Sequence, residues 1–426
     1  MSSRLSSFVA LQHRNFRLLW IGQLISFSGS MMQMAAILWH VSLLVRPERR
    51  ALALGMVGLV RLMPVIFFSI AAGTVADAWD RRRMMLYTQS AAAAVAVVLA
   101  ALTFRGLTHP WPIYVLAALG AVAGAFDGPA RQAMLPTLVP REHLPNAISL
   151  NAIMFQIASV TGPSLGGLVI AALGVAWVYA FNALTFGCVI AALLMMRNIP
   201  PRDASHAPDV SWRAVREGLR FVFAAPIIRS TMLLDFFATF FSSATALLPI
   251  FAQDILHVGA RGYGWLYAAP SVGAVLTSLV MVRSIEHIER RGIVLLWSVV
   301  LYGGATAVFG LSRTFWLTFF CLALTGAADT VSMVLRNVVR QLETPDRLRG
   351  RMIGVNMVFF MGGPQLGELE AGGVAQWLGA RVSVVTGGLG CLIATAWIAA
   401  TTPALRHYRR GVVDADEPAR LRSVVR

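Results

Sequence analysis

Long apolar segments separated by short polar connections follow one another along the whole chain. Each segment runs for roughly 20 residues, the length that an α-helix needs to cross the hydrocarbon core of a bilayer. Transmembrane β-barrels show shorter segments of alternating polarity, and this chain lacks that pattern. The sequence therefore predicts an all-α polytopic membrane protein of about twelve transmembrane helices. The expected spans are 18–45, 52–76, 84–104, 111–130, 146–173, 176–196, 228–251, 263–282, 292–311, 315–335, 353–376 and 381–401.

The expected spans fall into two halves, divided by a polar connection near 198–217. At one constant shift along the chain, Pro140 aligns with Pro345 and Asn151 aligns with Asn356. A parallel repeat of this kind predicts two pseudo-symmetric six-helix bundles with a substrate site between them, which rock to give alternating access. The same shift also pairs Arg131 with Arg336, Gly162 with Gly367, Gly167 with Gly372 and Gly174 with Gly379.

The division into halves predicts four regions. They are an N-terminal bundle (1–197), a cytoplasmic linker (198–220), a C-terminal bundle (221–402) and a basic cytoplasmic tail (403–426). The stretch SWRAVREGLRFVF begins in the linker and has the amphipathic pattern of an interfacial helix.

The composition supports a membrane protein, because 57% of the residues are hydrophobic and only 13% are charged. A soluble protein of this size needs more charge to cover its surface. Every basic residue is an arginine, since the sequence contains no lysine. The phosphate-binding Walker loop requires a lysine after its glycines, so ATP-driven transport within this chain is not expected.

The arginines are unevenly distributed between the two sides of the membrane. They concentrate in the N-terminal segment, in the C-terminal tail and in alternate connections such as 81–83, 197–220 and 283–291. By the positive-inside rule, this bias predicts that both termini are cytoplasmic, and we expect a bacterial cytoplasmic membrane. The net charge of +16 then suits the anionic lipids of the inner leaflet and requires no nucleic acid partner.

The sequence shows no pattern of a metal, cofactor or catalytic site. The cysteines Cys188, Cys321 and Cys391 lie singly within apolar spans, where they are typical of small core side chains. The histidines are scattered, and no nucleophile is spaced with a base. We therefore expect neither an enzyme nor a protein with a bound metal or cofactor.

The connection GTVADAWDRRR, residues 73–83, lies between the second and third spans on the expected inner side. Gly73 permits close helix approach, and Asp77 can accept hydrogen bonds from the N-terminus of a neighbouring helix. The arginines can bridge to acids on another helix. A plain positive-inside loop would explain the arginines but not the glycine and aspartate before them. The basic cluster consists of Arg81, Arg82 and Arg83.

This connection resembles the cytoplasmic loop signature of the major facilitator superfamily, in which it ties the inner ends of the two bundles together in the outward-open state. Here Ala78 replaces the usual basic residue after the aspartate, and Asp80 replaces a common glycine. The resemblance covers nearly all of the chain and implies the two-bundle fold and a monomer. The stretches NFRLLWIGQLISFSG, DGPARQAMLPTLVPREHLPNAISLN, LPIFAQDIL, GYGWLYAAPSVGA and TPDRLRGR are similar to the branch that contains enterobactin exporters and macrolide-type efflux proteins.

The fifth span contains the stretch ASVTGPSLGG, whose glycines and proline are poor helix formers in water. In a bilayer, small residues let helices pack closely, and neighbouring groups compensate the hydrogen bond that proline lacks. The stretch resembles the antiporter motif of the superfamily's drug exporters, which implies export rather than uptake. A plain small-residue packing face is the alternative and shares the same geometry. The motif positions are Ala158, Gly162, Pro163, Gly166 and Gly167, with Ala158 in place of the family's glycine.

Ionisable residues inside the spans are candidates for function, because each is costly to place in a membrane. Asp235, Asp329, Glu368 and Glu370 lie in the second half, where a carboxylate would couple transport to the proton gradient. Arg61 in the second span either attracts an anionic substrate or pairs with an acid.

Ion pairs near the inner surface are the alternative for the acids. Asp127 stands four residues before Arg131, the spacing of a helical ion pair. Asp329 is expected to pair with an arginine of the inner loop cluster, which begins at Arg336.

Polar and aromatic residues of two further spans are candidates for lining a cavity, although most membrane aromatics face lipid or the protein core. They are Gln23, Gln33, Phe236 and Phe240.

Together these features predict a secondary active transporter that works by alternating access. We expect a proton-coupled antiporter that exports an amphipathic small molecule, drug-like or siderophore-like, with protons and the bilayer as its other partners. A proton-coupled uptake symporter shares the fold and the loop signature, but the fifth-span motif counts against it. A non-transporting sensor with a transporter fold is a further alternative, and the near-complete motifs count against that reading.

Overall fold

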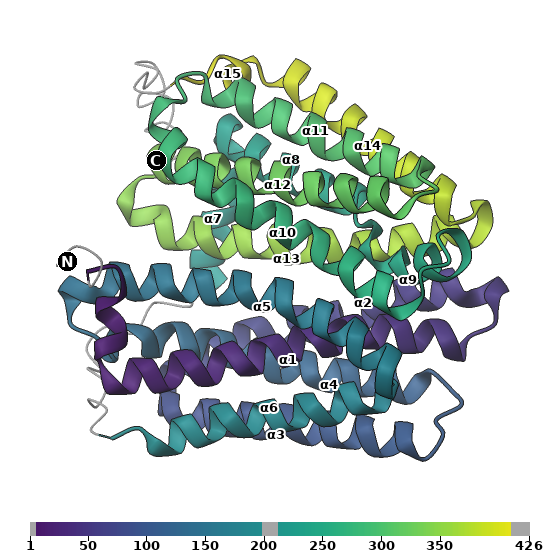
Figure 1. The fold of residues 1–426 in the computed structure, drawn as a ribbon. Coiled ribbons are helices and arrows are strands. Elements are labelled where there is room, and N and C mark those ends of the chain that lie inside the picture. Colours follow the sequence, from purple (N-terminus) through teal and green to yellow (C-terminus); the bar gives the residue numbers. More distant parts are fainter. Residues whose placement is uncertain (1–5, 198–211, 410–426) are drawn as a thin grey trace. The chain divides into compact units, whose positions relative to one another are not determined.

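The computed structural model describes residues 6–197 and 212–409, in which helices account for nearly all of the chain and no strand occurs. Figure 1 shows their arrangement. The long helices are α1 (Arg14–Leu44), α2 (Pro47–Ala78), α3 (Arg81–Phe104), α4 (Trp111–Met134), α5 (Leu144–Leu173), α6 (Val175–Met195), α8 (Pro226–Phe241), α10 (Gly259–Ser284), α11 (Arg291–Leu311), α12 (Phe315–Glu343), α13 (Asp346–Leu378) and α14 (Ala380–Thr401).

Short helical segments connect or flank these helices. The segment α7 (Trp212–Ala224) coincides with the stretch expected to be amphipathic. The others are η1 (Ser6–Gln12), η2 (Leu135–Thr137), η3 (Arg141–His143), η4 (Ala244–Leu247), α9 (Leu248–Ile250), η5 (Phe251–Ile255), η6 (Ile285–His287) and α15 (Pro403–His407).

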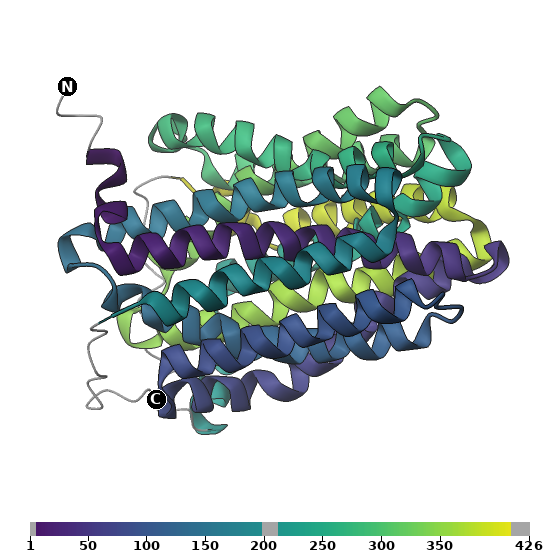
Figure 2. The same cartoon turned by 60° about the horizontal axis from the view of Figure 1, so that its bottom comes forward.

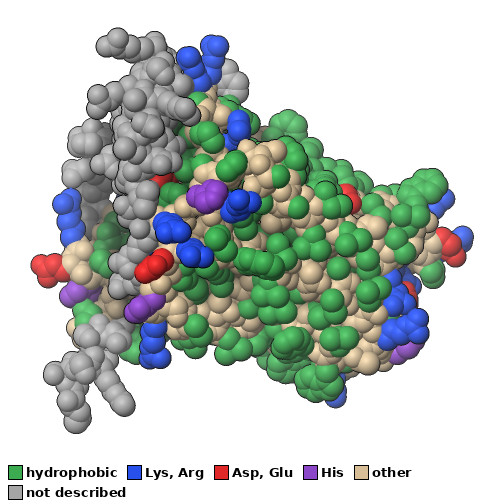
Figure 3. Space-filling view, turned by 90° about the horizontal axis from the view of Figure 1, so that it is seen from above, with side chains coloured by type: hydrophobic (Ala, Val, Ile, Leu, Met, Phe, Trp, Pro, Cys, Tyr) green, Lys and Arg blue, Asp and Glu red, His purple; other side chains and the backbone are tan. Residues whose placement is uncertain are grey.

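The helices have the lengths and composition of membrane spans. Among the described residues, 11 helical segments are long and apolar enough to cross a bilayer, and the 33-residue α13 covers the remaining expected span. In Figure 3, hydrophobic side chains cover the middle of the displayed face, and charged side chains gather toward its two ends. This distribution is that of a surface in contact with lipid. The predicted all-α membrane fold is confirmed.

The expected seventh span is not one continuous helix. The helix α8 ends at Phe241, and the chain continues through η4, α9 and the π-helical η5. Ser242 adopts a non-helical conformation, and Pro249 has no backbone N–H to donate. Hydropathy alone does not register such a break, because the residues on both sides of it are equally apolar.

The described chain forms two compact units. The first consists of the described residues of Met1–Ala207 together with Leu248–Ala268, and the second consists of those of Pro208–Leu247 and Ala269–Arg426. Each has its own apolar core, formed around Phe16 and Met85 in the first and around Leu295 and Leu335 in the second.

Helix pairing within each unit follows the same scheme. In the first unit, α1 packs against α5 and α6, and α3 packs against α6; Figure 2 shows α1 between its two partners. In the second unit, α8 packs against α13 and α14, and α11 packs against α14. The pairing of α1 with α5 and α6 thus corresponds to that of α8 with α13 and α14. The pairing of α3 with α6 corresponds to that of α11 with α14, as an internal repeat requires.

Candidate functional site

A buried ion pair joins two helices of the second unit. Oδ1 of Asp235 in α8 lies 2.9 Å from Nη2 of Arg336 in α12. Both side chains are almost completely buried, with 3% and 2% of their surface exposed. An unpaired charge at this depth is costly, so each group is tolerated because the other offsets it.

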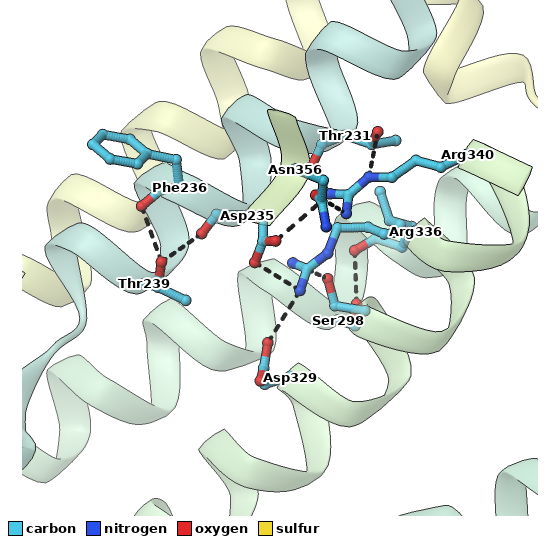
Figure 4. A network of polar contacts seen from close by, with 11 residues as sticks. Thr231, Asp235, Phe236, Thr239, Ser298, Asp329, Arg336, Arg340 and Asn356 are labelled. Atoms are coloured by element: carbon cyan, nitrogen blue, oxygen red, sulfur yellow. Dashed lines mark hydrogen bonds and ion pairs between the residues drawn. The ribbon is translucent and has the colours of Figure 1, made fainter. Parts of the chain in front are cut away.

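A second arginine completes the surroundings of Asp235. Arg340, one helical turn after Arg336, places Nη2 at 3.6 Å from Oδ2 of Asp235. Its guanidinium also donates to the carbonyl oxygen of Thr231 at 2.9 Å and to the side-chain oxygen of Asn356 in α13. Three helices, α8, α12 and α13, are thus joined through one guanidinium, as Figure 4 shows.

Asp329 is the partly exposed acid of this network. Its Oδ1 lies 3.4 Å from the same Nη2 of Arg336 that contacts Asp235, yet 42% of its side chain is exposed. The other terminal nitrogen of Arg336, Nη1, donates to Ser332 at 2.9 Å. One guanidinium is therefore shared by a buried carboxylate and an accessible one (Figure 4).

This arrangement suits reversible protonation of one acid. With both carboxylates ionised, the charges of two acids and two arginines balance. If Asp329 takes up a proton, Arg336 and Arg340 both keep their contact with Asp235, and the network gains one net positive charge. The predicted ion pair of Asp329 is therefore present, but its partner lies inside α12 rather than in a surface loop.

The location of Arg336 corrects the expectation for this region. We placed Arg336 in an inner loop, whereas it lies within α12 and is 2% exposed. The helix continues beyond the expected boundary at residue 335 because Asp235 and Ser332 bind the guanidinium within the core.

Two predicted cavity-lining aromatics lie on α8 next to the network. Phe236 and Phe240 are half-buried and stack with their ring centroids 5.7 Å apart. Phe236 also meets Phe359 of α13 edge-on, at 6.1 Å. The two rings thus form a partly open apolar surface that begins one residue after Asp235.

The glutamates of α13 are separate from this network. None of the three ion pairs of the network involves Glu370. Glu368 is 8% exposed, and Oε2 of the half-buried Glu370 has no hydrogen-bond partner. Both remain candidates, without the arrangement that distinguishes Asp329.

The fifth-span glycines bring α5 into close contact with α1. A Cβ atom added at Gly162 would lie 2.6 Å from both the Cβ of Met31 and the carbonyl oxygen of Ser28. One added at Gly166 would lie 2.9 Å from Cγ of Met32. Only glycine fits at these contacts, so the motif positions serve helix packing, whatever further role they have.

The last glycine of the motif faces a different helix of the same unit. A Cβ at Gly167 would lie 2.6 Å from the carbonyl oxygen of Ala260 and 2.7 Å from Cα of Gly264, both in α10. Ala158 and Pro163 are buried within α5. In the second unit, Gly367 makes the equivalent approach to the carbonyl oxygen of Phe240 in α8, in agreement with the predicted alignment of Gly162 with Gly367.

Within the part of the chain that the structure describes, Arg81 and Arg82 of the basic cluster bind helix ends rather than acids. Arg81 donates to the carbonyl oxygen of Ala133 at 2.7 Å, and Arg82 donates to those of Leu193 at 2.8 Å and Leu194 at 3.1 Å. Carbonyl groups at helix C-termini lack partners within the helix and attract cations, which explains this choice.

The rest of the loop signature is only partly described. The backbone N–H of Arg83 bonds to Asp80, which caps α3 in place of the family's glycine. The side chains around Gly73 and Asp77 lie outside the described residues.

The predicted ion pair between Asp127 and Arg131 does not form. Asp127 accepts hydrogen bonds from Thr88 at 3.0 Å and Gln89 at 2.8 Å in α3. The guanidinium carbon of Arg131 lies over the ring of Phe27 in α1, 4.3 Å from its centroid. Two neutral donors satisfy the acid, and an aromatic face supports the arginine instead.

Arg61 has no acidic partner among the described residues. Its Nη2 lies 3.5 Å from the sulfur of Met34 in α1, and no carboxylate is within 4.0 Å. Gln23 is buried and its side-chain nitrogen makes no hydrogen bond, whereas Gln33 accepts one from Asn182 of α6 at 2.8 Å. Gln33 thus connects two helices, and its side-chain oxygen is already engaged.

A set of polar contacts that sequence reasoning missed holds Leu248–Ala268 within the first unit. Arg50 pairs with Asp254 at 2.7 Å, and Gln253 donates to Ser42 at 2.7 Å. The hydroxyl of Tyr263 donates to the carbonyl oxygen of Ala35 at 2.7 Å. Each contact joins residues about 200 or more positions apart in sequence. Local patterns therefore gave no signal for them.

Two other missed residues had a visible signal. Arg340 follows Arg336 by four residues and therefore lies on the same helix face. Asn356 was part of the internal repeat, where it aligns with Asn151. Both signals point to the face of α12 and α13 that contacts Asp235.

The chain matches a known protein family over most of its length. The sequence model of the family described as "transmembrane secretion effector" matches residues 5–414. The enterobactin exporter EntS of Escherichia coli K12 is 28% identical over 344 residues, which is 80% of this chain and 81% of that protein. EntS of Shigella dysenteriae serotype 1 matches to the same extent.

Solved transporters share the fold at low sequence identity. A bacterial homologue of the lysosomal transporter Spinster, in an inward-facing and unoccupied conformation, superposes with a TM-score of 0.72 at 15% identity, covering 96% of this chain and 100% of that one. The nucleoside transporter NupG gives 0.67 at 14% identity, with coverage of 92% and 99%. A bacterial homologue of the iron transporter ferroportin gives 0.66 at 16%, with coverage of 93% and 99%.

Proposed function

Because the chain belongs to the transmembrane secretion effector family of major facilitator transporters, we propose that it is a proton-coupled antiporter that exports an amphipathic small molecule. Export is supported by the likeness to the enterobactin exporter and by the glycine motif of α5, which packs against α1 and α10. We propose the bacterial cytoplasmic membrane as its location, with both termini in the cytoplasm and the monomer as the transporting unit.

The sharing of Arg336 between Asp235 and Asp329 is the observation that carries the proposal of proton coupling. A coupling site must accept and release a proton from water during the transport cycle. Asp329 has the exposure for this exchange, and Asp235 keeps the arginine paired in both states. The half-buried rings of Phe236 and Phe240 beside the network would offer an apolar surface to the cargo.

The test is efflux of a panel of lipophilic fluorescent dyes from bacteria that express the protein, with and without a protonophore. We expect protonophore-sensitive efflux by the wild type and its loss in Asp329→Asn. Glu289→Gln is the matched control, because this substitution removes one acid at an exposed position outside the network.

Three other outcomes would each change the account. Efflux that persists in Asp329→Asn but disappears in Glu368→Gln would move the proton site to α13. Efflux that is insensitive to the protonophore would contradict proton coupling. Accumulation of a dye in place of its efflux would contradict export and favour an uptake symporter.

A further inference from the structure

Two arginines in the spans of the first unit contact the same face of α1. Arg61 from α2 meets Met34, and Arg131 from α4 lies over Phe27. Phe27 and Met34 are two helical turns apart and therefore on one face, with about 10 Å between them along the axis. The two guanidinium groups are thus placed at two levels along a single helix.

Neither arginine has a carboxylate within ion-pair distance among the described residues. Asp127 is occupied by Thr88 and Gln89. Both arginines are half-buried, so their charge is only partly solvated. Arginines inside a span that no acid contacts are costly and typically face a ligand or a water-filled cavity. Arg336 and Arg340 of the second unit differ, because Asp235 and Asp329 together offset their charge.

The face between the two arginines combines apolar and polar groups. Phe27 meets Phe155 of α5 edge-on at 6.0 Å, and Met34 is half-buried. Gln23, one turn before Phe27 on the same face, has a buried side-chain nitrogen without an acceptor. Such a surface offers aromatic and thioether contacts to an apolar body and cationic donors to its negative groups.

We propose that the exported cargo is an amphipathic organic anion with at least two negative groups, and that Arg61 and Arg131 bind these groups along α1. The inference rests on the proposed function, which leaves the charge of the cargo open. Guanidinium groups suit carboxylate, phenolate and phosphate oxygens, because their donors form paired hydrogen bonds with them. A cargo with a net positive charge would be repelled by the same surface.

The test compares two dyes that share the xanthene ring system and differ in charge. Purified protein in detergent is titrated into carboxyfluorescein, an aromatic polyanion, and into rhodamine 6G, a cation, and binding is followed by fluorescence anisotropy. We expect the wild type to bind carboxyfluorescein at least about tenfold more tightly than rhodamine 6G. Arg61→Gln and Arg131→Gln should each weaken binding of the anion by about tenfold.

Two further variants separate the role of charge from that of folding. Arg61→Lys keeps the positive charge and should retain most of the affinity that Arg61→Gln loses. Arg313→Gln removes one charge from an exposed position and should bind as the wild type does. The melting temperature of every variant is measured to show that it is folded. If Arg131→Gln fails to fold, the affinity of Arg61→Gln for carboxyfluorescein still tests the inference.

The inference would be overturned by equal or tighter binding of rhodamine 6G, by absence of carboxyfluorescein binding to the wild type, or by unchanged affinity in both glutamine variants. Transport is measured separately in vesicles made from the same preparations. Binding of the anion without protonophore-sensitive export would count against the proposed antiporter and leave the assignment of cargo charge standing. Protonophore-sensitive export of rhodamine 6G alone would support the proposed antiporter and overturn the assignment of an anionic cargo.

Discussion

At the scale of single residues, the second unit gives its two aspartates different roles. The Asp235 side chain is enclosed by two guanidinium groups and is 3% exposed, whereas that of Asp329 reaches one of them and is 42% exposed. Loss of the Asp235 charge leaves two buried guanidinium groups without a buried acid, whereas loss of the Asp329 charge leaves both in contact with Asp235. In our proposal, stability and proton exchange therefore fall to different carboxylates.

This division predicts that neutralising the two aspartates destabilises the protein to different extents. Asp235→Asn should lower the free energy of unfolding by about 3–5 kcal/mol, because Arg336 and Arg340 then lack their shared partner. Asp329→Asn should cost at most about 1 kcal/mol, since its side chain is 42% exposed. Thermal unfolding in detergent, followed by loss of the monodisperse peak, measures both. Equal destabilisation of the two variants would contradict the division.

At the scale of elements, glycines determine how closely α5 approaches α1. An added methyl group at Gly162 meets the carbonyl oxygen of Ser28, which belongs to the backbone and cannot turn away as a side chain can. The contact between these helices therefore depends on the absence of a side chain at one position.

The prediction is that Gly162→Ala destabilises the first unit by roughly 1–3 kcal/mol, because the two helices must separate to admit the methyl group. Gly187→Ala in α6 is the control, since its added Cβ would have no neighbour within 4 Å. That variant should be neutral or slightly stabilising, as alanine is the better helix former. The melting temperatures of the two variants compare them directly, and a similar decrease in both would argue against a packing role for Gly162.

The polar contacts of Leu248–Ala268 give a second prediction at this scale. Asp254→Asn removes the ion pair with Arg50, whose contribution is limited to about 1 kcal/mol because half of the Asp254 side chain is exposed. We expect faster amide hydrogen exchange in residues 248–258, measured by mass spectrometry, and unchanged exchange elsewhere in the first unit. The charge-swapped pair of Arg50→Asp with Asp254→Arg should restore the wild-type rates. Unchanged exchange in Asp254→Asn would show that the ion pair contributes nothing to holding this segment.

The sequence predicted elements far better than it predicted partners. The helix α6 begins one residue before its expected start, and α14 does the same, because a glycine with positive φ, Gly174 or Gly379, stands directly before each. Arg336 was placed in a loop because local polarity does not reveal Asp235, which is about 100 positions earlier in the chain. Asp127 and Arg131 had the spacing of an ion pair, yet residues of two other helices took their places as partners.

At the scale of the whole molecule, the two units share their helix pairing but differ in the charged residues that they bury. Both units pair their helices in the same way, and glycines stand at the equivalent contacts Gly162 and Gly367. The second unit holds the carboxylates Asp235 and Asp329 that share Arg336, and the first holds Arg61 and Arg131, which contact Met34 and Phe27. In our proposal, one unit therefore exchanges the proton and the other recognises the cargo.

The distribution of arginines makes a prediction about topology. A green fluorescent protein fused after the C-terminus should fluoresce in bacteria, because the positive-inside rule places that end in the cytoplasm. Alkaline phosphatase inserted after Arg105, in a connection expected outside, should be active. An inactive phosphatase together with a dark fluorescent protein would reverse the assigned orientation.

Proton movement driven by the cargo tests the central claim most directly. The protein is reconstituted into liposomes that contain a pH-sensitive dye, and the xanthene that the wild type transports best is added without an imposed pH gradient. We predict that entry of the xanthene drives protons out, that Glu289→Gln behaves as the wild type does, and that Asp329→Asn moves no protons. Cargo-driven proton movement that persists in Asp329→Asn would contradict the assignment of coupling to the Asp235–Arg336–Asp329 network.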